Sequence, residues 1–273
     1  MRARVVIAGL AALALTAAAC GAGGDESSII GKERLIIGVK PDQPGLGLKK
    51  KEGVYEGFDV DVAKEVAARV AGKGVSVQFV DAPSSQRERL LQAGQVDLVV
   101  ATYSITPERK TKVAFAGPYY VAHQDTLVRQ SETRIRNVRD LRGRNLCQVT
   151  GSNSWRRVQE EKKIPVNLVK AASYSMCIDK LKSGDVDAVS TDDLILAGFA
   201  ASEGNQVKII NAPFTDERYG IGIRQGDIDG CEAVNKAITE MYQDGTAQKL
   251  LKKWFGATTL TLTETVPQFE GCD

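Results

Sequence analysis

Polar side chains follow two similar stretches of the sequence, at positions where they could bind a small molecule. Both stretches, LLQAGQVDLVVATYSIT (90–106) and KLKSGDVDAVSTDDLIL (180–196), contain a helix, a glycine turn, Val-Asp, an apolar strand and then polar residues. Ligands of open α/β sheets gather outside the carboxyl ends of strands, which is where Thr102, Ser104 and Asp192 stand. Each half of the chain therefore offers half a site, and two such halves facing each other would form a cleft.

The sequence lacks the residues that a catalytic site, a metal site or a dinucleotide site would need. His123 is the only histidine, so no Ser-His-Asp or Cys-His set can be assembled for nucleophilic catalysis. There is no CxxC pair and no supporting histidine, so we expect no zinc or other metal. The GLG at 45–47 lacks the GxGxxG form, so a dinucleotide is unsupported and we expect no cofactor.

Strands and helices alternate along the chain and would position these polar residues. In the segment 58–70, apolar residues recur four positions apart, from Phe58 to Val70, which predicts one face of a helix. Thr106 and Pro107 begin another helix as its cap and first residue. The alternation implies a parallel sheet and an α/β class. The further predicted elements are strands at 34–40, 75–80, 96–101, 166–171 and 186–191, a strand ending at 149, and helices at 85–94, 154–163, 174–184 and 229–256.

Length and composition place the chain among globular proteins. A chain of 273 residues can bury a sizeable core without help from metals or disulfides. Hydrophobic residues make up 43% and charged residues 26%, close to the averages of soluble globular proteins. These values exclude a disordered chain, a collagen-like fibre and a multi-span membrane protein.

Residues 1–19 are typical of a secretory signal, because Arg2 and Arg4 precede an apolar run too short for a membrane span. The three alanines at 17–19 stand before Cys20, as in the lipobox of bacterial lipoproteins, which implies cleavage before Cys20 and lipid, such as palmitate, on that cysteine. Several acyl chains would hold the protein on a membrane surface. In the alternative reading, an ordinary signal is cleaved and Cys20 has no role. Removal of residues 1–19 would remove both arginines and leave 34 basic residues, equal in number to the 34 acidic ones. The mature chain would then carry no net charge, so its electrostatics do not favour binding to a nucleic acid.

Two longer motifs resemble a known family. GFDVDVAKEVAARV (57–70) is similar to the signature of the family-3 extracellular solute-binding proteins, the polar amino-acid receptors of ABC importers. ATYSITPERKTKVAFAGPYY (101–120) resembles the second hallmark of that family, and the resemblance covers roughly residues 33–256. KPDQPGLG (40–47) before GFDVDVA looks like the glutamate-binding lipoproteins of Gram-positive bacteria. Four further segments fit as well: VTGSNS (149–154), GDVDAVSTDD (184–193), RYGIGI (218–223) and DGTAQKLLKKWFG (244–256).

The resemblance implies a two-lobe fold of the type II periplasmic-binding-protein kind, with α/β lobes that are joined by two crossing strands and close like a hinge. Lobe 1 would comprise residues 33–123 and 219–273, and lobe 2 residues 124–218. The signal peptide (1–19) and a lipidated, flexible tether (20–32) would precede them.

The cysteines other than Cys20 are even in number, which suggests disulfides in an oxidising compartment. Three pairings are possible, and four reduced, buried cysteines are the alternative. We favour Cys147–Cys177 and Cys231–Cys272, because each pair would then fall within one lobe of the implied fold.

The resemblance also implies residues that hold an amino-acid head group. Arg109 would bind the α-carboxylate, since its planar fork can donate two parallel hydrogen bonds, and Thr102 and Ser104 would accompany it. Asp192 would hold the α-ammonium, while its neighbour Asp193 is expected to cap a helix. Free backbone amides at a helix start would attract the carboxylate oxygens from the loop of lobe 2. That loop comprises Thr150, Gly151, Ser152 and Asn153.

The residues that read the ligand side chain are less defined. Lys40 stands where glutamine-type relatives have an acid, and a cation there would favour an acidic γ-carboxylate. Gln43 follows in the same loop. Lys40 could instead be solvated at the loop edge, and Arg156 and Arg157 are further candidate cations or mere surface charge. Asp59 and Asp61, at a helix start, are expected to be structural.

We therefore expect a receptor that is not an enzyme, anchored by lipid on the extracytoplasmic face of the cell membrane. It would act as a monomer and deliver a free amino acid, glutamate first, to the permease and ATPase subunits of an ABC importer. Glutamine, aspartate and asparagine are alternative ligands, and a cyclohexadienyl-dehydratase-like enzyme is the alternative activity. A sensor domain would normally continue into a transmembrane segment, and nothing after Phe255 could span a membrane.

Overall fold

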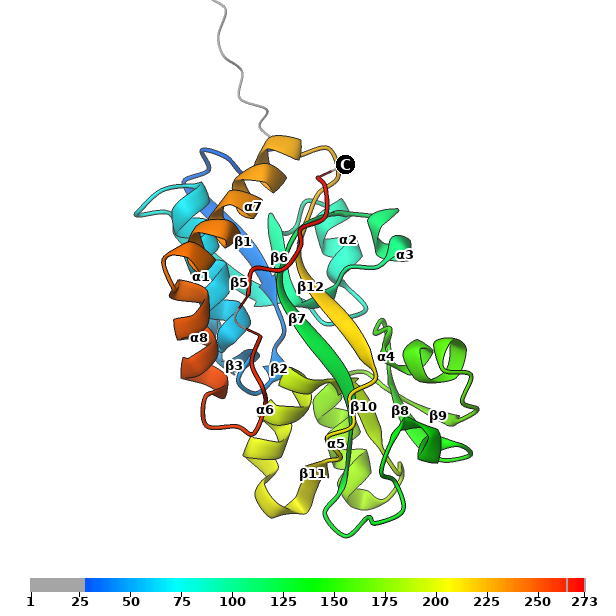
Figure 1. Ribbon diagram of the computed structural model, residues 1–273. Helices are drawn as coiled ribbons and strands as arrows, with labels where there is room; N and C mark the ends of the chain where they lie inside the picture. Colours follow the sequence, from blue (N-terminus) through cyan, green and yellow to red (C-terminus); the bar gives the residue numbers. More distant parts are fainter. Residues whose placement is uncertain (1–27, 264, 273) are drawn as a thin grey trace, which may run out of the picture.

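The computed structural model describes residues 28–263 and 265–272, arranged as two α/β lobes, one above the other in Figure 1. Two long strands, β7 (Ala114–Arg129) and β12 (Thr215–Ile223), pair antiparallel and run from the upper lobe into the lower one. The two-lobe α/β architecture with two crossing strands is therefore confirmed. The predicted lipidation site, Cys20, lies outside the described residues.

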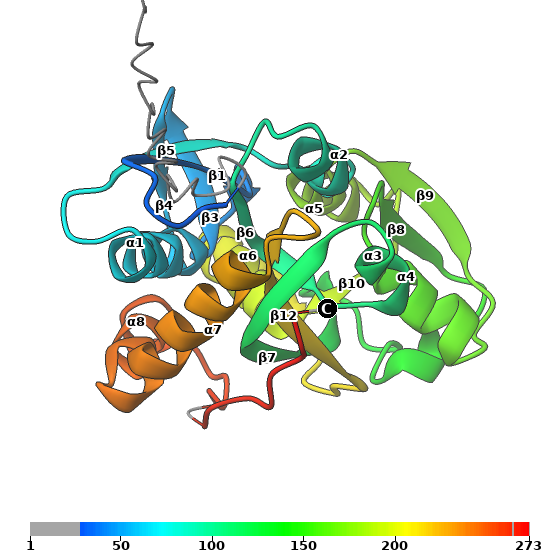
Figure 2. The same ribbon diagram turned by 90° about the horizontal axis from the view of Figure 1, so that it is seen from above.

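The upper lobe is built around the parallel strands β5, β1 and β6, with β1 in the middle. β12 joins the outer side of β6 in antiparallel direction, so the crossing strands extend the same sheet. In Figure 2, α1, α7 and α8 lie together on one side of this sheet. The elements of the upper lobe are β1 (Arg34–Val39), β2 (Asp42–Gln43), β3 (Gly47–Lys51), β4 (Val54–Glu56), α1 (Phe58–Val70), β5 (Ser76–Asp81), α2 (Arg87–Gln92), β6 (Leu98–Ser104), α3 (Pro107–Lys110), α7 (Ile228–Gln243) and α8 (Thr246–Phe255).

The lower lobe is a continuous segment of the chain between the two crossing strands. Its strands β10 and β11 pair antiparallel with β7, and β8 pairs in parallel with β9. Its elements are β8 (Asn145–Val149), α4 (Ser154–Arg156), a π-helical turn (Arg157–Glu161), β9 (Asn167–Ala171), α5 (Tyr174–Ser183), β10 (Val189–Asp192), α6 (Asp193–Glu203), β11 (Val207–Ile209), and 3-10 turns at Val138–Leu141 and Gly204–Gln206.

An aromatic cluster holds the upper lobe to the crossing strands. Phe58 of α1 lies 6.2 Å from the ring of Tyr120 on β7 and 6.4 Å from that of Phe255 on α8, measured between centroids. All three side chains are almost fully buried. Each such pair contributes about 0.5–1.5 kcal/mol beyond the area it buries, so α1 and α8 are fixed against β7.

Three elements differ from those predicted. The helix predicted over 229–256 is two helices, because Gly245 adopts a left-handed conformation (φ 79°) that ends α7 before α8 begins. The helix predicted over 154–163 is the short α4 followed by a π-helical turn. The strand β7 was not among the strands assigned from the sequence pattern, and its Gly117–Pro118 peptide is cis.

The described ends of the chain pack on the upper lobe. Residues 28–32 were expected to belong to the tether, but Ile29 is buried and its backbone N–H donates to Asp227. After α8, the chain passes alongside β7 to Cys272, which forms a disulfide with Cys231 of α7. The second disulfide joins Cys147 to Cys177 within the lower lobe, so the pairing that the sequence analysis favours is present.

Candidate binding cleft

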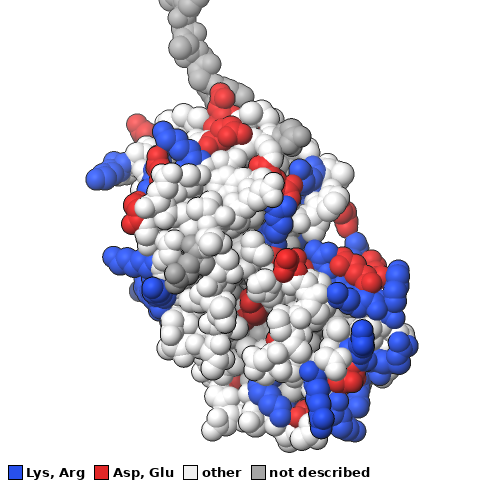
Figure 3. Space-filling model, in the orientation of Figure 1, with Lys and Arg blue, Asp and Glu red and all other residues white. Residues whose placement is uncertain are grey.

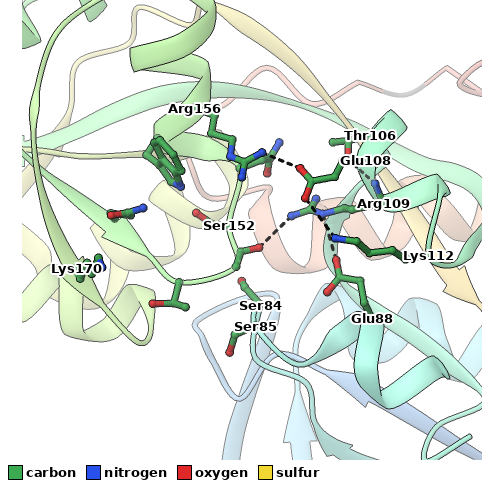
Figure 4. A pocket seen from close by; sticks show the side chains of 15 residues that line it. Ser84, Ser85, Glu88, Thr106, Glu108, Arg109, Lys112, Ser152, Arg156 and Lys170 are labelled. Atoms are coloured by element: carbon green, nitrogen blue, oxygen red, sulfur yellow. Dashed lines mark hydrogen bonds and ion pairs between the residues drawn. The ribbon is translucent and has the colours of Figure 1, made fainter. Parts of the chain in front are cut away.

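A cavity of about 520 Å³ opens between the two lobes (Figure 4). Arg109 of the upper lobe reaches across it toward the loop of the lower lobe, where its guanidinium donates to the backbone carbonyl of Gly151. Its lining residues are Ser84, Ser85, Glu88, Thr106, Glu108, Arg109, Lys112, Gln148, Thr150, Gly151, Ser152, Asn153, Trp155, Arg156 and Lys170.

Arg109 is a buried cation at the boundary between the lobes. Helix α3 positions it, and the Thr106 hydroxyl caps that helix by accepting the backbone N–H of Arg109 at 3.2 Å. Its guanidinium donates to the carbonyl of Ser104 at 2.7 Å and to the carbonyl of Gly151, in the lower lobe, at 3.3 Å. Burial lowers the pKa of Arg109, and its nearest carboxylate, that of Glu88, is 3.6 Å from Nε. The group is suited to a carboxylate partner.

The end of β6 carries Thr102 and Ser104, which are both buried and do not line the cavity. Thr102 has a φ of 44°, a strained conformation for a β-branched residue. Asp59 stabilises it by accepting the backbone N–H of Thr102 at 2.8 Å, and Asp59 also accepts the hydroxyl of Tyr119 at 2.7 Å. Burial raises the pKa of Asp59 to about 7. The signature residue Asp59 therefore supports the site without lining the cavity.

Asp192 is the buried acid that the sequence analysis assigns to the lower lobe. It ends β10 with only 4% of its surface exposed, and it accepts the hydroxyl of Tyr219 at 2.8 Å. Burial and the nearby Glu217 raise its pKa well above the ordinary value, and within the described residues it has no ion-pair partner. Its neighbour Asp193, which was expected to cap a helix, is instead the first residue of α6, and the cap position is that of Asp192 itself. The Asp193 carboxylate accepts the backbone N–H of Leu194 at 2.7 Å. An ammonium group would satisfy Asp192.

Lys40 and Gln43 lie in the interior, so the reading of Lys40 as solvated at a loop edge is wrong. Lys40 is 2% exposed, and its Nζ donates to the hydroxyl of Ser84 at 2.7 Å. Burial, and then the charge of Arg87, lower the pKa of Lys40 to about 7, and no ion pair to Lys40 occurs in the described part of the chain. The Gln43 Nε2 is buried without a hydrogen-bond partner. Neither Lys40 nor Gln43 is among the residues that line the cavity.

Sequence reasoning missed Arg87, which is as deeply buried as Lys40. Its guanidinium donates to the carbonyls of Ala101 and Gly151, at 3.0 and 3.4 Å, while its buried Nε has no partner. In the sequence, Arg87 lies within a run of charges and looks like a surface residue. The available signal was its spacing of three and four residues from Leu90 and Leu91, which places it on the buried face of the helix.

The other two candidate cations have carboxylate partners. Arg156, at the cavity rim, pairs at 2.7 Å with Glu108 of the opposite lobe. Arg157 pairs at 2.6 Å with Glu217, which is buried and also accepts the amide of Asn153 at 3.3 Å. Figure 3 shows many more Lys and Arg side chains on the right of the lower lobe, intermixed with carboxylates. Unlike Arg156 and Arg157, the buried Lys40 has no such partner among the described residues.

The loop after β8 forms the lower-lobe side of the cavity. Its backbone amides are not all free, because that of Thr150 donates to Ala171 and that of Ser152 donates to Val149. Gly151 has a φ of 80°, and a Cβ there would lie 2.5 Å from the backbone nitrogen of Ser85 in the upper lobe. Close contact between the lobes therefore requires glycine at this position.

The upper lobe thus holds three buried cations and the lower lobe a buried carboxylate, and of these four residues only Arg109 is among those that line the cavity. The cations are Lys40, Arg87 and Arg109, and the carboxylate is Asp192. Such a set matches a zwitterion that carries additional negative charge, since buried charges need partners. In residues 28–263 and 265–272, no group of three His, Cys, Asp or Glu side chains is placed to hold a metal ion. No helix of that part is long and apolar enough to cross a membrane.

Comparisons with known proteins agree on one family. The model of the bacterial extracellular solute-binding proteins, family 3, matches residues 35–257. The chain is 40% identical over 270 residues to the glutamate-binding protein GluB of Corynebacterium glutamicum, a match that covers 94% of this chain and 91% of the relative.

Two solved structures extend the comparison to the fold. An ancestral arginine-binding protein bound to arginine has a TM-score of 0.75 and 35% identity, covering 83% of this chain and all of the other. An ancestral amino acid-binding protein described as a precursor of cyclohexadienyl dehydratase has a TM-score of 0.73 and 32% identity, covering 82% of this chain and 95% of the other.

Proposed function

The chain belongs to family 3 of the bacterial extracellular solute-binding proteins, and we propose that it binds glutamate between its two lobes. Its place in the family makes it an extracytoplasmic amino-acid receptor of an ABC importer. The observation that carries the choice of glutamate is Lys40, a buried cation with no ion-pair partner in the described residues. A ligand with a second carboxylate would supply that partner.

The head group and the side chain of the ligand would use different residues. Arg109 would bind the α-carboxylate together with Thr102, Ser104 and the loop after β8, and Asp192 would bind the α-ammonium. Lys40, Gln43 and Arg87 would then face the γ-carboxylate. This division is supported by the unpartnered Nε2 of Gln43 and Nε of Arg87, since buried polar atoms are normally hydrogen-bonded.

The relatives support an amino acid as the ligand, and together with the buried cations they restrict the charge of its side chain. GluB of Corynebacterium glutamicum is named as a glutamate-binding protein, and the ancestral structure holds arginine. A cationic side chain would be repelled by Lys40 and Arg87, which lie buried in the upper lobe. We therefore expect arginine to bind far more weakly than glutamate, with glutamine and aspartate between them.

We propose a receptor without catalytic activity, although one structural neighbour is a precursor of a dehydratase. The buried Asp192, with Tyr219 donating to it, resembles a counter-charge for an ammonium group more than a proton-transfer residue. His123 lies on β7 with its Nδ1 2.9 Å from Asp216, outside the residues that line the cavity. An amino acid recovered unchanged after prolonged incubation would agree with this reading.

We further propose that the protein is a monomer, anchored by lipid on Cys20, and that it serves the permease and ATPase subunits of its importer. The lobe boundaries are proposed at residues 123/124 and 218/219, within the crossing strands. Cys20→Ala should abolish lipidation, which fractionation and mass spectrometry of the N-terminal peptide would detect. Correctly processed Cys20→Ala protein that stays on the membrane would refute the anchor.

Isothermal titration of the mature protein tests the ligand. Glutamate, glutamine, aspartate, asparagine and arginine should be titrated separately, with glutamate expected to bind most tightly. Tightest binding of glutamine would retain the receptor but reject the role of Lys40. Binding of none of the five would reject the proposed function.

A further inference from the structure

Asp42 of the upper lobe supplements the cap of α5 in the lower lobe, whose N-cap residue is Ser173. Its carboxylate Oδ2 accepts the backbone N–H of Tyr174 at 3.0 Å and that of Ser175 at 3.2 Å, both in the first turn of α5. The first amides of a helix have no partner within it, and a negative charge there is further favoured by the helix dipole. Since Asp42 and α5 lie on opposite sides of the cleft, these bonds exist only while the lobes are together.

Pro44 makes a second contact with the lower lobe, against Gly198 in the middle of α6. A Cβ at residue 198 would lie 1.9 Å from the carbonyl oxygen of Pro44, far inside the 3.0 Å that real Cβ atoms keep. Gly198 has ordinary helical backbone angles, so α6 itself does not require glycine there. The close approach of Pro44 is what excludes a side chain at this position.

Gln43 lies between these two contacts and belongs to the candidate site. Its side chain is fully buried, its Oε1 accepts the hydroxyl of Thr102 at 3.1 Å, and its Nε2 has no partner. Asp42 and Gln43 form β2, which lies just above α5 and α6 in Figure 1. Contacts on both sides of Gln43 therefore fix its amide, and the nearby Lys40, relative to the lower lobe.

We propose that Asp42, Pro44 and Gly198 form an interlobe latch that sets how long the cleft stays closed. The proposal rests on the proposed function, because a latch matters only where the lobes close on a ligand. These three residues act as positioning residues, since their contacts are with the opposite lobe. The latch should therefore change the affinity for every ligand by the same factor, mainly through the dissociation rate.

The first test compares Asp42→Ala with Asp42→Asn. Alanine removes the oxygen that caps α5, and loss of such a cap should weaken both glutamate and glutamine about fivefold, with an equal rise in dissociation rate. Asparagine caps helices nearly as well as aspartate, so it should restore most of the affinity even though the charge is lost. Glu52→Gln is the matched control. It removes a carboxylate from the same lobe, but this carboxylate is exposed and pairs with Lys49.

The second test is Gly198→Ala, which should not destabilise the fold. Alanine is favoured over glycine in a helix, so the melting temperature without ligand should stay the same or rise. The added Cβ should nevertheless hold the lobes apart, weakening every ligand more than tenfold and leaving a larger radius of gyration at saturating glutamate. Ala201→Ser is the control, because it also adds one heavy atom to α6, at an exposed position.

The wild-type titration separates failure of the latch from failure of the proposed function. If the wild type binds none of the amino acids, the receptor function and the latch both fall. If it binds and contracts in solution scattering, but both Asp42→Ala and Gly198→Ala match its affinity and dissociation rate, the latch alone is refuted. A loss confined to glutamate would also refute it, because the residues would then select the ligand.

Discussion

Replacement of Lys40 by glutamine tests whether this lysine selects an acidic ligand. Lys40 Nζ donates to Ser84 Oγ at 2.7 Å, and no carboxylate of the described residues pairs with it. Glutamate would supply that carboxylate. In Lys40→Gln, the γ-carboxylate would instead be buried beside a neutral amide, while the neutral side chain of glutamine would meet no unpaired ammonium.

The expected loss follows from the burial of the pair. Removing one partner of a buried ion pair costs roughly 3–5 kcal/mol, which is on the order of a hundredfold to several thousandfold in affinity. Arg87 and Arg109 remain nearby and also attract the γ-carboxylate, so glutamate should lose about a hundredfold, at the lower end. Glutamine should bind as well as before or better.

The same substitution should stabilise the protein at low pH. Burial lowers the pKa of Lys40 from 10.5 to about 7, a penalty on the order of 5 kcal/mol for the charged form. The penalty is complete below pH 7 and disappears as the pH rises toward 10.5, where the unfolded chain also carries a neutral lysine. Lys40→Gln should therefore melt at a higher temperature than the wild type at pH 6, with a smaller gain at pH 9.

Calorimetric titration of both ligands into both proteins is the assay, because selectivity is a ratio of affinities. Lys49→Gln is the control, since Lys49 forms its ion pairs with Glu52 and Asp81 and lies outside the cleft. If Lys40→Gln weakens both ligands equally, or neither, Lys40 does not contact the γ-carboxylate. Arg87 would then be the next residue to replace.

Three further predictions concern the head group, the pH and the disulfides. Arg109→Ala should weaken every amino-acid ligand by a similar factor, on the order of a hundredfold or more, because it removes the partner of the α-carboxylate; a loss restricted to glutamate in the same titrations would contradict this. Glutamate affinity should fall as the pH rises above about 7, because Lys40, surrounded by Arg87, Asp42, Arg109 and Asp59, is charged below that pH and must take up a proton above it. In the wild type, the affinity for glutamine should depend less on pH than the affinity for glutamate. In Lys40→Gln, the two affinities should depend on pH to the same extent when both ligands are titrated from pH 6 to 8.5. Each disulfide closes a loop, of 30 or 41 residues in sequence separation, and should contribute about 2–4 kcal/mol to the free energy of unfolding; chemical denaturation of the double variant Cys147→Ser/Cys177→Ser should show this loss, and an unchanged midpoint would refute it.

The fold was predictable where the pattern of apolar residues is regular. Helix α1 has the predicted bounds, 58–70, because its apolar residues recur four apart and that face is buried. The break between α7 and α8 was not predicted, because helical periodicity continues on both sides of Gly245 and only the backbone conformation of that residue separates them. A sequence pattern reports which face of a helix is buried more reliably than where the helix ends.

The candidate site was predictable only in part. The spacing of Thr102, Ser104 and Arg109 along one motif brought them to attention together, and in the structure all three are buried and Arg109 donates to the carbonyl of Ser104. Asp42 and Arg87 were not assigned, because a charged residue in a loop or in a run of charges looks solvated. Both residues contact chain segments that are far away in the sequence. Asp42 accepts from Tyr174, and Arg87 donates to Gly151.

The path of the chain through the two lobes has a consequence for maturation during export. A chain that emerges from its N-terminus exposes the lower lobe as one uninterrupted segment, whose sheet and Cys147–Cys177 bond can form early. The upper lobe must wait, because β12 completes its sheet and α7 and α8 cover it only after the lower lobe has left the export channel. The Cys231–Cys272 bond then closes last. An oxidant that acts too soon would meet Cys147 and Cys177 while both later cysteines are still inside the channel, so the order of emergence itself protects the correct pairing.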